Sequence, residues 1–150
     1  MKELILTLLL SSWNGVGLYR IYHVLKKKKL LFDDHFTLVI CMAITMLSSF
    51  VFSMYLILLF PSFYAAPFVL SVWVGWKFGT LLGNPAKLSG LYNGAMGGGM
   101  GTMLGAVLQN PALCKIPVES ADAVNMYSIP VAAACFYACM LMSIRYSLRM

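Results

Sequence analysis

Charged residues are scarce in this sequence. Asp, Glu, Lys and Arg make up 11% of its 150 residues, whereas hydrophobic residues make up 61%. Soluble domains average about 25% charged and about 45–50% apolar residues. A chain this short cannot hide so much apolar surface in a water-soluble core. The composition therefore excludes an ordinary soluble domain and predicts one all-α integral membrane domain over residues 1–150, with the lipid bilayer as its surroundings.

Recognisable catalytic and ion-coupling features are also missing. The sequence contains no HExxH, GxSxG, Walker A or Rossmann glycine pattern. It places no ionisable residue near the middle of an apolar segment, where ion-coupled transporters carry one. Both histidines, His23 and His35, lie at the ends of such segments. We therefore expect a protein that is neither an enzyme nor a secondary active transporter.

Five apolar blocks are long enough to cross a bilayer, which takes about 20 residues of helix. They cover residues 4–25, 36–60, 64–82, 88–108 and 126–144. The first block also resembles a secretory signal peptide, but the SSWNG sequence at residues 11–15 is a poor cleavage site. We predict five transmembrane helices joined by short loops, of which the longest covers residues 109–125.

Basic residues gather on one side of this predicted arrangement. If successive helices cross the membrane in opposite directions, most cations fall on one side: Arg20, the four lysines at 26–29, Lys77, Lys87, Arg145 and Arg149. Only Lys2 and Lys115 fall on the other side. Because cytoplasmic loops carry the excess of Lys and Arg, we expect the N-terminus outside and the C-terminus in the cytoplasm of a bacterial cell. The lysine run then lies at lipid headgroups rather than on nucleic acid.

The fourth block is rich in glycine. Two series have a spacing of four residues: Gly90, Gly94 and Gly98, and then Gly97, Gly101 and Gly105. Each glycine would weaken a helix in water by about 0.8–1.0 kcal/mol, but in lipid small residues let helix backbones approach closely. We expect a glycine zipper that makes this helix the packing centre, within the chain or in a homo-oligomer.

Methionines occupy the opposite face of the same block. At the helical period, Ser89, Asn93, Met96, Met100 and Met103 share one stripe. Thioethers are ligands for Cu(I), although methionine also fills irregular gaps between helices. In the fifth block Cys135 and Cys139 lie one helical turn apart and offer two thiols. A joint copper site requires the two helices to converge, which the sequence does not show.

The tripeptide Asn-Pro-Ala occurs twice, at residues 84–86 and 110–112. Aquaporins carry this tripeptide in two half-helices, but in separate halves of a much longer chain. Here the two copies bracket a single apolar block, so we exclude a water channel. Asparagine is a good N-cap and proline suits the first helical position. Asn84 is therefore expected to cap the fourth helix.

Three functions remain compatible with these features. The first is a small membrane protein that binds or conducts a soft metal ion such as Cu(I). Its ligands would be Met96, Met100, Met103, Cys135 and Cys139, with Asn93 and Ser89 lining the route. The second is a non-catalytic subunit, assembly factor or regulator of a larger membrane complex. The third is an uncoupled channel or permease for a small solute.

Overall fold

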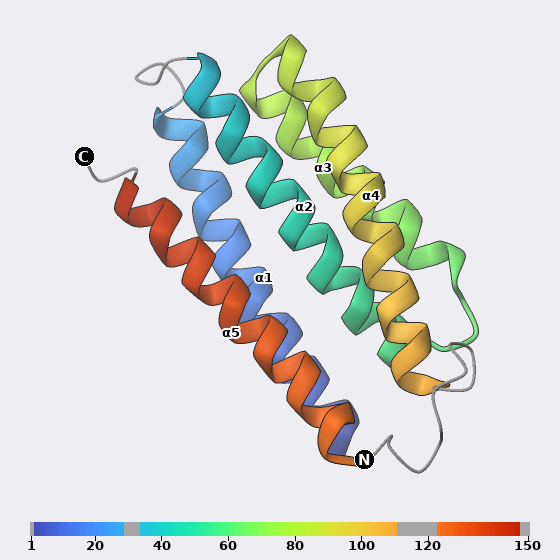
Figure 1. Ribbon diagram of the computed structural model, residues 1–150. Helices are drawn as coiled ribbons and strands as arrows, with labels where there is room; N and C mark the ends of the chain where they lie inside the picture. Colours follow the sequence, from blue (N-terminus) through green and yellow to red (C-terminus); the bar gives the residue numbers. More distant parts are fainter. Residues whose placement is uncertain (1, 29–33, 111–122, 148–150) are drawn as a thin grey trace.

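The structure is a computed structural model that describes residues 2–28, 34–110 and 123–147. These residues form five helices and no strand: α1 Lys2–Lys28, α2 Asp34–Leu59, α3 Ala65–Leu82, α4 Asn84–Gln109 and α5 Ala123–Ser147 (Figure 1). The prediction of an all-helical chain with five helices is confirmed, and each expected block agrees with one helix to within four residues at either end. Most of the predicted loop at 109–125 lies outside the described residues.

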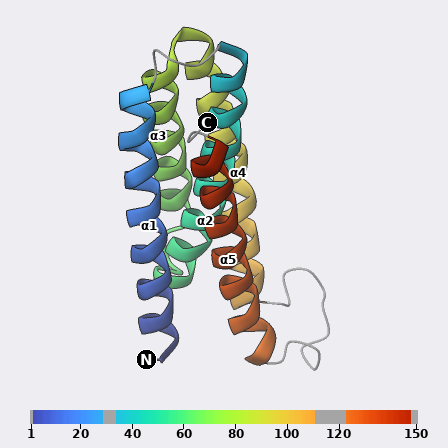
Figure 2. The same ribbon diagram turned by 90° about the vertical axis from the view of Figure 1, so that its left-hand side faces the viewer.

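The helices alternate in direction, so the N-terminus and the C-terminal end of α5 lie at opposite ends of the bundle (Figures 1 and 2). This alternation brings the described Lys and Arg side chains toward one end, here called the basic end: Arg20, Lys26, Lys27, Lys77, Lys87 and Arg145. No Asp or Glu side chain is among those that the structure describes. The bundle therefore has a charged end and a long apolar body.

Two helical stretches within the described residues are long and apolar enough to cross a membrane. They are His35–Leu59 in α2 and Ser128–Ser147 in α5. The other helices are continuous but less apolar: α1 contains Arg20, the short α3 contains Lys77, and α4 contains many glycines. Helix length and composition are therefore compatible with a membrane protein.

Helix α2 is the one that packs against all four others, closely against α3 and α4 and less closely against α1 and α5. On one side it meets α3 and α4, which also pack closely against each other, and on the other side it meets the α1–α5 pair (Figure 1). The buried apolar residues follow this plan and include Ile21, Ile44, Met54, Tyr55, Tyr137 and Leu141. The packing centre is thus shared, because α2 has the most partners while α4 makes the closest contacts.

One glycine series of α4 faces α3. A Cβ atom added at Gly90 would lie 2.6 Å from the carbonyl oxygen of Gly75, and one added at Gly94 would lie 2.8 Å from that of Ser71. Real Cβ atoms do not approach backbone oxygens so closely. The backbones of α3 and α4 can therefore meet only because both helices carry glycine at this crossing.

The other glycine series faces α2. A Cβ atom added at Gly97 would collide with the carbonyl oxygen of Met46, and one added at Gly101 would collide with that of Phe50. Gly105 continues this line toward the end of α4, where a Cβ would strike the side chain of Ile57. Helix α4 is therefore wedged between α2 and α3, and both series are occupied inside the chain.

Serine hydroxyls join α2 to α3 beside Gly98 of α4. Ser49 of α2 donates to the carbonyl oxygen of Ser71 at 3.3 Å, and Ser53 donates to that of Pro67 at 3.2 Å. The hydroxyls of Ser53 and Ser71 also hydrogen-bond each other. All three serines are buried. Their short side chains satisfy one another where larger polar groups would not fit.

A single residue, Gly83, connects α3 to α4. Its φ of 128° is a backbone conformation that residues with a Cβ rarely adopt, so glycine permits the reversal. The expectation that Asn84 caps α4 is wrong, because Gly83 is the N-cap and no side chain caps the helix. The Asn84 side chain instead accepts a hydrogen bond from Lys87 Nζ at 3.0 Å. The tight reversal already places residue 84 inside the helix, which leaves no extended position for a capping side chain.

Candidate functional site

The methionine face of α4, defined here as Met96, Met100 and Met103, points away from the bundle. Their exposed fractions are 42%, 49% and 72%. The outward orientation follows from the glycines, because these hold the opposite side of α4 against α2 and α3. The three thioethers therefore lie on an outer surface of this chain.

The polar residues of the same stripe bond within their own helix. Asn93 is half-buried, and its Nδ2 donates to the Ser89 carbonyl oxygen at 2.8 Å and to the Ser89 hydroxyl at 3.2 Å. This i to i+4 pairing anchors the Asn93 amide along α4. Asn93 and Ser89 therefore continue the outward stripe toward the basic end as one hydrogen-bonded pair.

A small residue is also free on the outward side of α4. A Cβ added at Gly99 would have no neighbour within 4 Å, unlike one added at any other glycine within a helix. Ala95 precedes Gly99 by one helical turn, and both are partly exposed. Met96 and Met103 lie three and four residues from Gly99 on the same helix. The outward side of α4 thus carries two small residues, Ala95 and Gly99, with methionines beside them.

The cysteine pair lies elsewhere. Cys135 and Cys139 are free and exposed on α5, whereas Cys41 is buried in α2. Helices α4 and α5 lie on opposite sides of α2, and their mutual contact is slight (Figure 1). Within the described ranges no three His, Cys, Asp or Glu side chains come together as metal ligands. The structure therefore keeps the methionine face and the thiols apart rather than joining them in one site.

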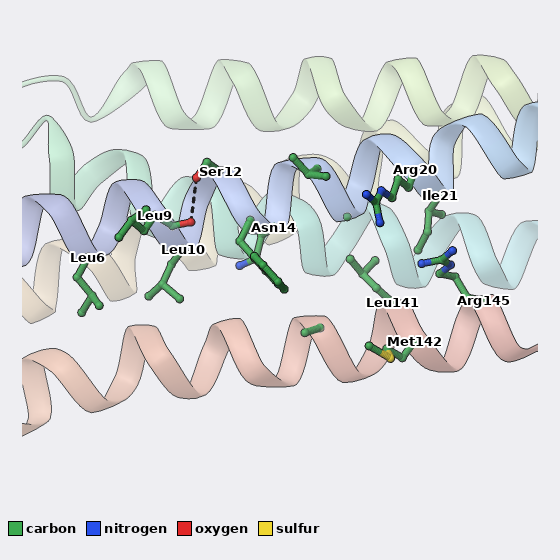
Figure 3. A pocket seen from close by; sticks show the side chains of 14 residues that line it. Leu6, Leu9, Leu10, Ser12, Asn14, Arg20, Ile21, Leu141, Met142 and Arg145 are labelled. Atoms are coloured by element: carbon green, nitrogen blue, oxygen red, sulfur yellow. Dashed lines mark hydrogen bonds between the residues drawn. The ribbon is translucent and has the colours of Figure 1, made fainter.

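A groove of about 590 Å³ runs between α1 and α5 (Figure 3). Its α1 wall extends from residue 6 to residue 21, and its α5 wall from residue 138 to residue 145. The walls are mainly apolar and include Leu6, Leu9, Leu10, Leu141 and Met142. The volume lies within the range of about 300–1,000 Å³ that is usual for ligand pockets.

Four polar side chains break the apolar lining of this groove: Ser12, Asn14, Arg20 and Arg145. Arg20 of α1 and Arg145 of α5 lie at the basic end of the groove and extend into it from facing walls (Figure 3). Asn14 lies farther down α1 and is only 1% exposed. The Asn14 side chain is close to the Tyr55 hydroxyl, yet its amide nitrogen makes no hydrogen bond to any described residue.

Tyrosine side chains link α2 to α5. The Tyr55 hydroxyl of α2 donates to the carbonyl oxygen of Pro130 at 3.0 Å. Pro130 lies inside α5, so this bond joins α2 to the body of α5 rather than to a loop. Tyr137, on the same helix, is buried and stacks edge-on against Phe52 of α2. These contacts fix α5 against α2 and hold one wall of the groove.

The groove was not predicted from the sequence. The arginines and Asn14 were visible as polar residues in or beside apolar blocks, but their distances along the chain gave no sign that α1 and α5 face each other. One sequence signal for a polar site here was Arg20, a charged residue inside the first apolar block, five residues before the predicted end of that block.

Comparison with known proteins adds no family. No protein-family model, no curated protein and no solved structure matches this chain. The function therefore has to be inferred from the geometry of the two surfaces described above, the outward side of α4 and the α1–α5 groove.

Proposed function

We propose that the chain crosses a membrane five times, with its basic end toward the cytoplasm. Three observations support this location: the two long apolar helices, the gathering of the described cations at one end, and the apolar side chains on the outside. Leu9, Val69 and Phe136 lie on three different helices and are each at least 60% exposed. In water such surfaces would drive aggregation, whereas in a bilayer they would contact the apolar acyl chains. At the basic end, Lys77 lies over the ring of Trp73 at 5.4 Å, a pairing suited to the membrane interface.

Within the membrane, we propose that the protein is a non-catalytic subunit or assembly factor that docks a partner helix on the outward side of α4. One observation carries this proposal: Gly99 is the glycine of α4 at which an added Cβ would meet no neighbour, and the partly exposed Ala95 lies one turn before it. Helices in lipid associate where small residues permit close backbone approach. The surrounding methionines adapt their shape to the surface that meets them. The remaining glycines of α4 pack against α2 and α3. The outward side of α4 is therefore the one still available to a partner helix.

Site-directed crosslinking in native membranes tests the docking proposal. In a chain with its cysteines replaced by serine, Met103→Cys should form a discrete crosslinked adduct, while Val69→Cys on the outer face of α3 should not. Adding Gly99→Leu to Met103→Cys should abolish the adduct, because the leucine side chain keeps a partner helix from approaching the α4 backbone closely. The fold should tolerate this leucine, since nothing lies within 4 Å of an added Cβ at Gly99.

Each crosslinking result has a defined meaning. An adduct of twice the chain mass identifies a homo-oligomer, and an adduct with another protein identifies a heteromeric complex. Equal crosslinking from Met103→Cys and Val69→Cys, or an adduct that survives Gly99→Leu, would refute docking at this surface.

Soft-metal binding is the second candidate function. It is favoured by one observation, the exposure of three thioethers along one strip of a single helix. Thioethers prefer Cu(I) among the biological metals. Because Cys135 and Cys139 lie on a separate helix, the methionine face would have to bind the ion by itself, within one chain or between copies.

Metal analysis after anaerobic Cu(I) loading tests this second candidate. Copper should be bound stoichiometrically by the natural chain and lost when Met96, Met100 and Met103 are all replaced by leucine. Replacing Met42 and Met46 by leucine is the matched control, because this pair is exposed to a similar degree one helical turn apart on α2. Equal copper in both variants, or no copper in the natural chain, would exclude the methionine face as a metal site.

A further inference from the structure

We propose that the groove between α1 and α5 binds one anionic phospholipid of the cytoplasmic leaflet. An acyl chain would lie along the apolar walls, and the phosphate would lie between Arg20 and Arg145. The inference rests on the proposed membrane location but is independent of the partner surface on α4. Three properties of the groove support the inference: its charges, its length and its lining.

The charges at the basic end call for an anion. Arg20 and Arg145 enter the groove from opposite walls, and no acidic side chain among the described residues pairs with either (Figure 3). Two guanidinium groups that face one space repel each other, and the repulsion grows as water is excluded. Guanidinium groups bind phosphate through paired, charge-assisted hydrogen bonds. A phosphodiester between them would offset one of the two positive charges, and its two free oxygens would accept hydrogen bonds from both arginines.

The length of the groove suits a lipid chain of one leaflet. Residues 6 to 21 of α1 line it, which corresponds to about 22 Å at a rise of about 1.5 Å per residue. One leaflet contributes about half of the roughly 30 Å hydrocarbon core. A chain that starts from a phosphate at Arg20 would therefore end within the groove, at the level of its leucine-lined part. Because the arginines lie at the basic end, the lipid belongs to the cytoplasmic leaflet under the proposed topology.

The lining distinguishes this groove from an ordinary lipid-facing surface. Gly17 lets the side chain of Leu141 approach α1, so the two helices close together on one side of the space. Asn14 then contributes an amide nitrogen that lacks a hydrogen bond, from a side chain that is 1% exposed. A buried donor without a partner costs about 1–3 kcal/mol. An ester oxygen of a phospholipid is an acceptor of the kind that this donor lacks.

Other occupants fit the groove less well. A zwitterionic lipid would leave the two arginine charges without net compensation. A partner helix would have to carry an acidic residue at the level of the arginines, and otherwise it would bury both charges against an apolar surface at high cost. A second copy of this chain would bring two more arginines to the same place. An anionic lipid satisfies charge, length and apolar lining together.

Native mass spectrometry of the full chain in detergent, with added phosphatidylglycerol or phosphatidylcholine, tests the inference. One phosphatidylglycerol molecule should bind at least about tenfold more tightly than phosphatidylcholine, because charge-assisted hydrogen bonds contribute selectively to the anionic lipid. The double variant Arg20→Gln/Arg145→Gln should lose this preference. The control Lys77→Gln/Lys87→Gln removes two cations from the same end of the bundle but outside the groove, and it should keep the preference.

A second variant separates the shape of the groove from its charge. Leu9→Trp fills the apolar part while both arginines remain, and it should also weaken phosphatidylglycerol binding about tenfold or more. Circular dichroism should show unchanged helix content, because Leu9 is exposed rather than part of the core. Equal binding of the two lipids, a preference that survives the loss of both arginines, or a chain dimer in place of the lipid adduct would overturn the inference.

The membrane location is checked separately. A chain that alkaline extraction releases from membranes would refute the proposed location. A chain that resists extraction but shows no preference for phosphatidylglycerol would refute only the lipid site.

Discussion

One added methyl group at position 101 should weaken the bundle, while the same methyl group at position 99 should not. At Gly101 an added Cβ would strike the carbonyl group of Phe50 and lie 3.0 Å from the Cβ of Ser53. These are backbone and near-backbone atoms that cannot rotate away, so α2 and α4 would have to separate. At Gly99 an added Cβ would meet nothing within 4 Å.

The expected size of the effect follows from comparing the two variants. Replacing glycine by alanine favours a helix by up to about 1 kcal/mol at either position, and this gain largely cancels in the comparison. Forcing extra atoms into a closely packed contact costs about 1–3 kcal/mol. Gly101→Ala should therefore unfold with a free energy about 1–3 kcal/mol lower than that of Gly99→Ala. Each 1.4 kcal/mol corresponds to about a tenfold change in the unfolding equilibrium constant.

Reversible unfolding in mixed micelles with increasing SDS, followed by circular dichroism, measures this difference. The natural chain should lie between the two variants or close to Gly99→Ala. If Gly101→Ala proves as stable as Gly99→Ala, the close approach of α4 to α2 is wrong. A protein in which both variants are destabilised equally would indicate that position 99 also packs inside the chain.

Two further predictions concern α5. Tyr55→Phe removes the hydrogen bond to the Pro130 carbonyl oxygen and should lower the unfolding free energy by about 0.5–1.5 kcal/mol. The same SDS titration measures this change, and an unchanged midpoint would mean that the bond does not hold α5 against α2. Cys135 and Cys139 should react with a small membrane-permeant thiol reagent in the folded protein, whereas Cys41 should react only after unfolding, because the first two are exposed and the third is buried. Labelling of single-cysteine chains followed by mass spectrometry reads this out, and rapid labelling of Cys41 would contradict the packing of α2.

The helices themselves were predictable because helix formation in an apolar chain is decided locally. Each block in the sequence agrees with one helix, and the alternation of direction follows from the short connections between them. The end at which the cations gather followed in the same way. The error at Asn84 shows where local reasoning fails: its residue type favours a cap, but the reversal at Gly83 takes that position.

The glycine spacing revealed two series but not their partners. One series binds α3 and the other binds α2, and this assignment depends on the crossing geometry of three helices. Periodicity places residues on faces of one helix, yet it carries no information about which face of another helix will meet them. Only the tertiary structure could show that Gly99 belongs to neither contact.

The separation of the proposed copper ligands has the same origin. The sequence determined that methionines share one face of α4 and that two thiols share one turn of α5. The packing of both helices around α2 determined that these groups point to different places. Likewise the sequence supplied Arg20, Arg145 and Asn14, while the pairing of α1 with α5 created a groove from them. Local sequence fixes the helices and their faces because those depend on neighbouring residues; the sites depend on contacts between residues far apart in the chain, and these exist only once the bundle has packed.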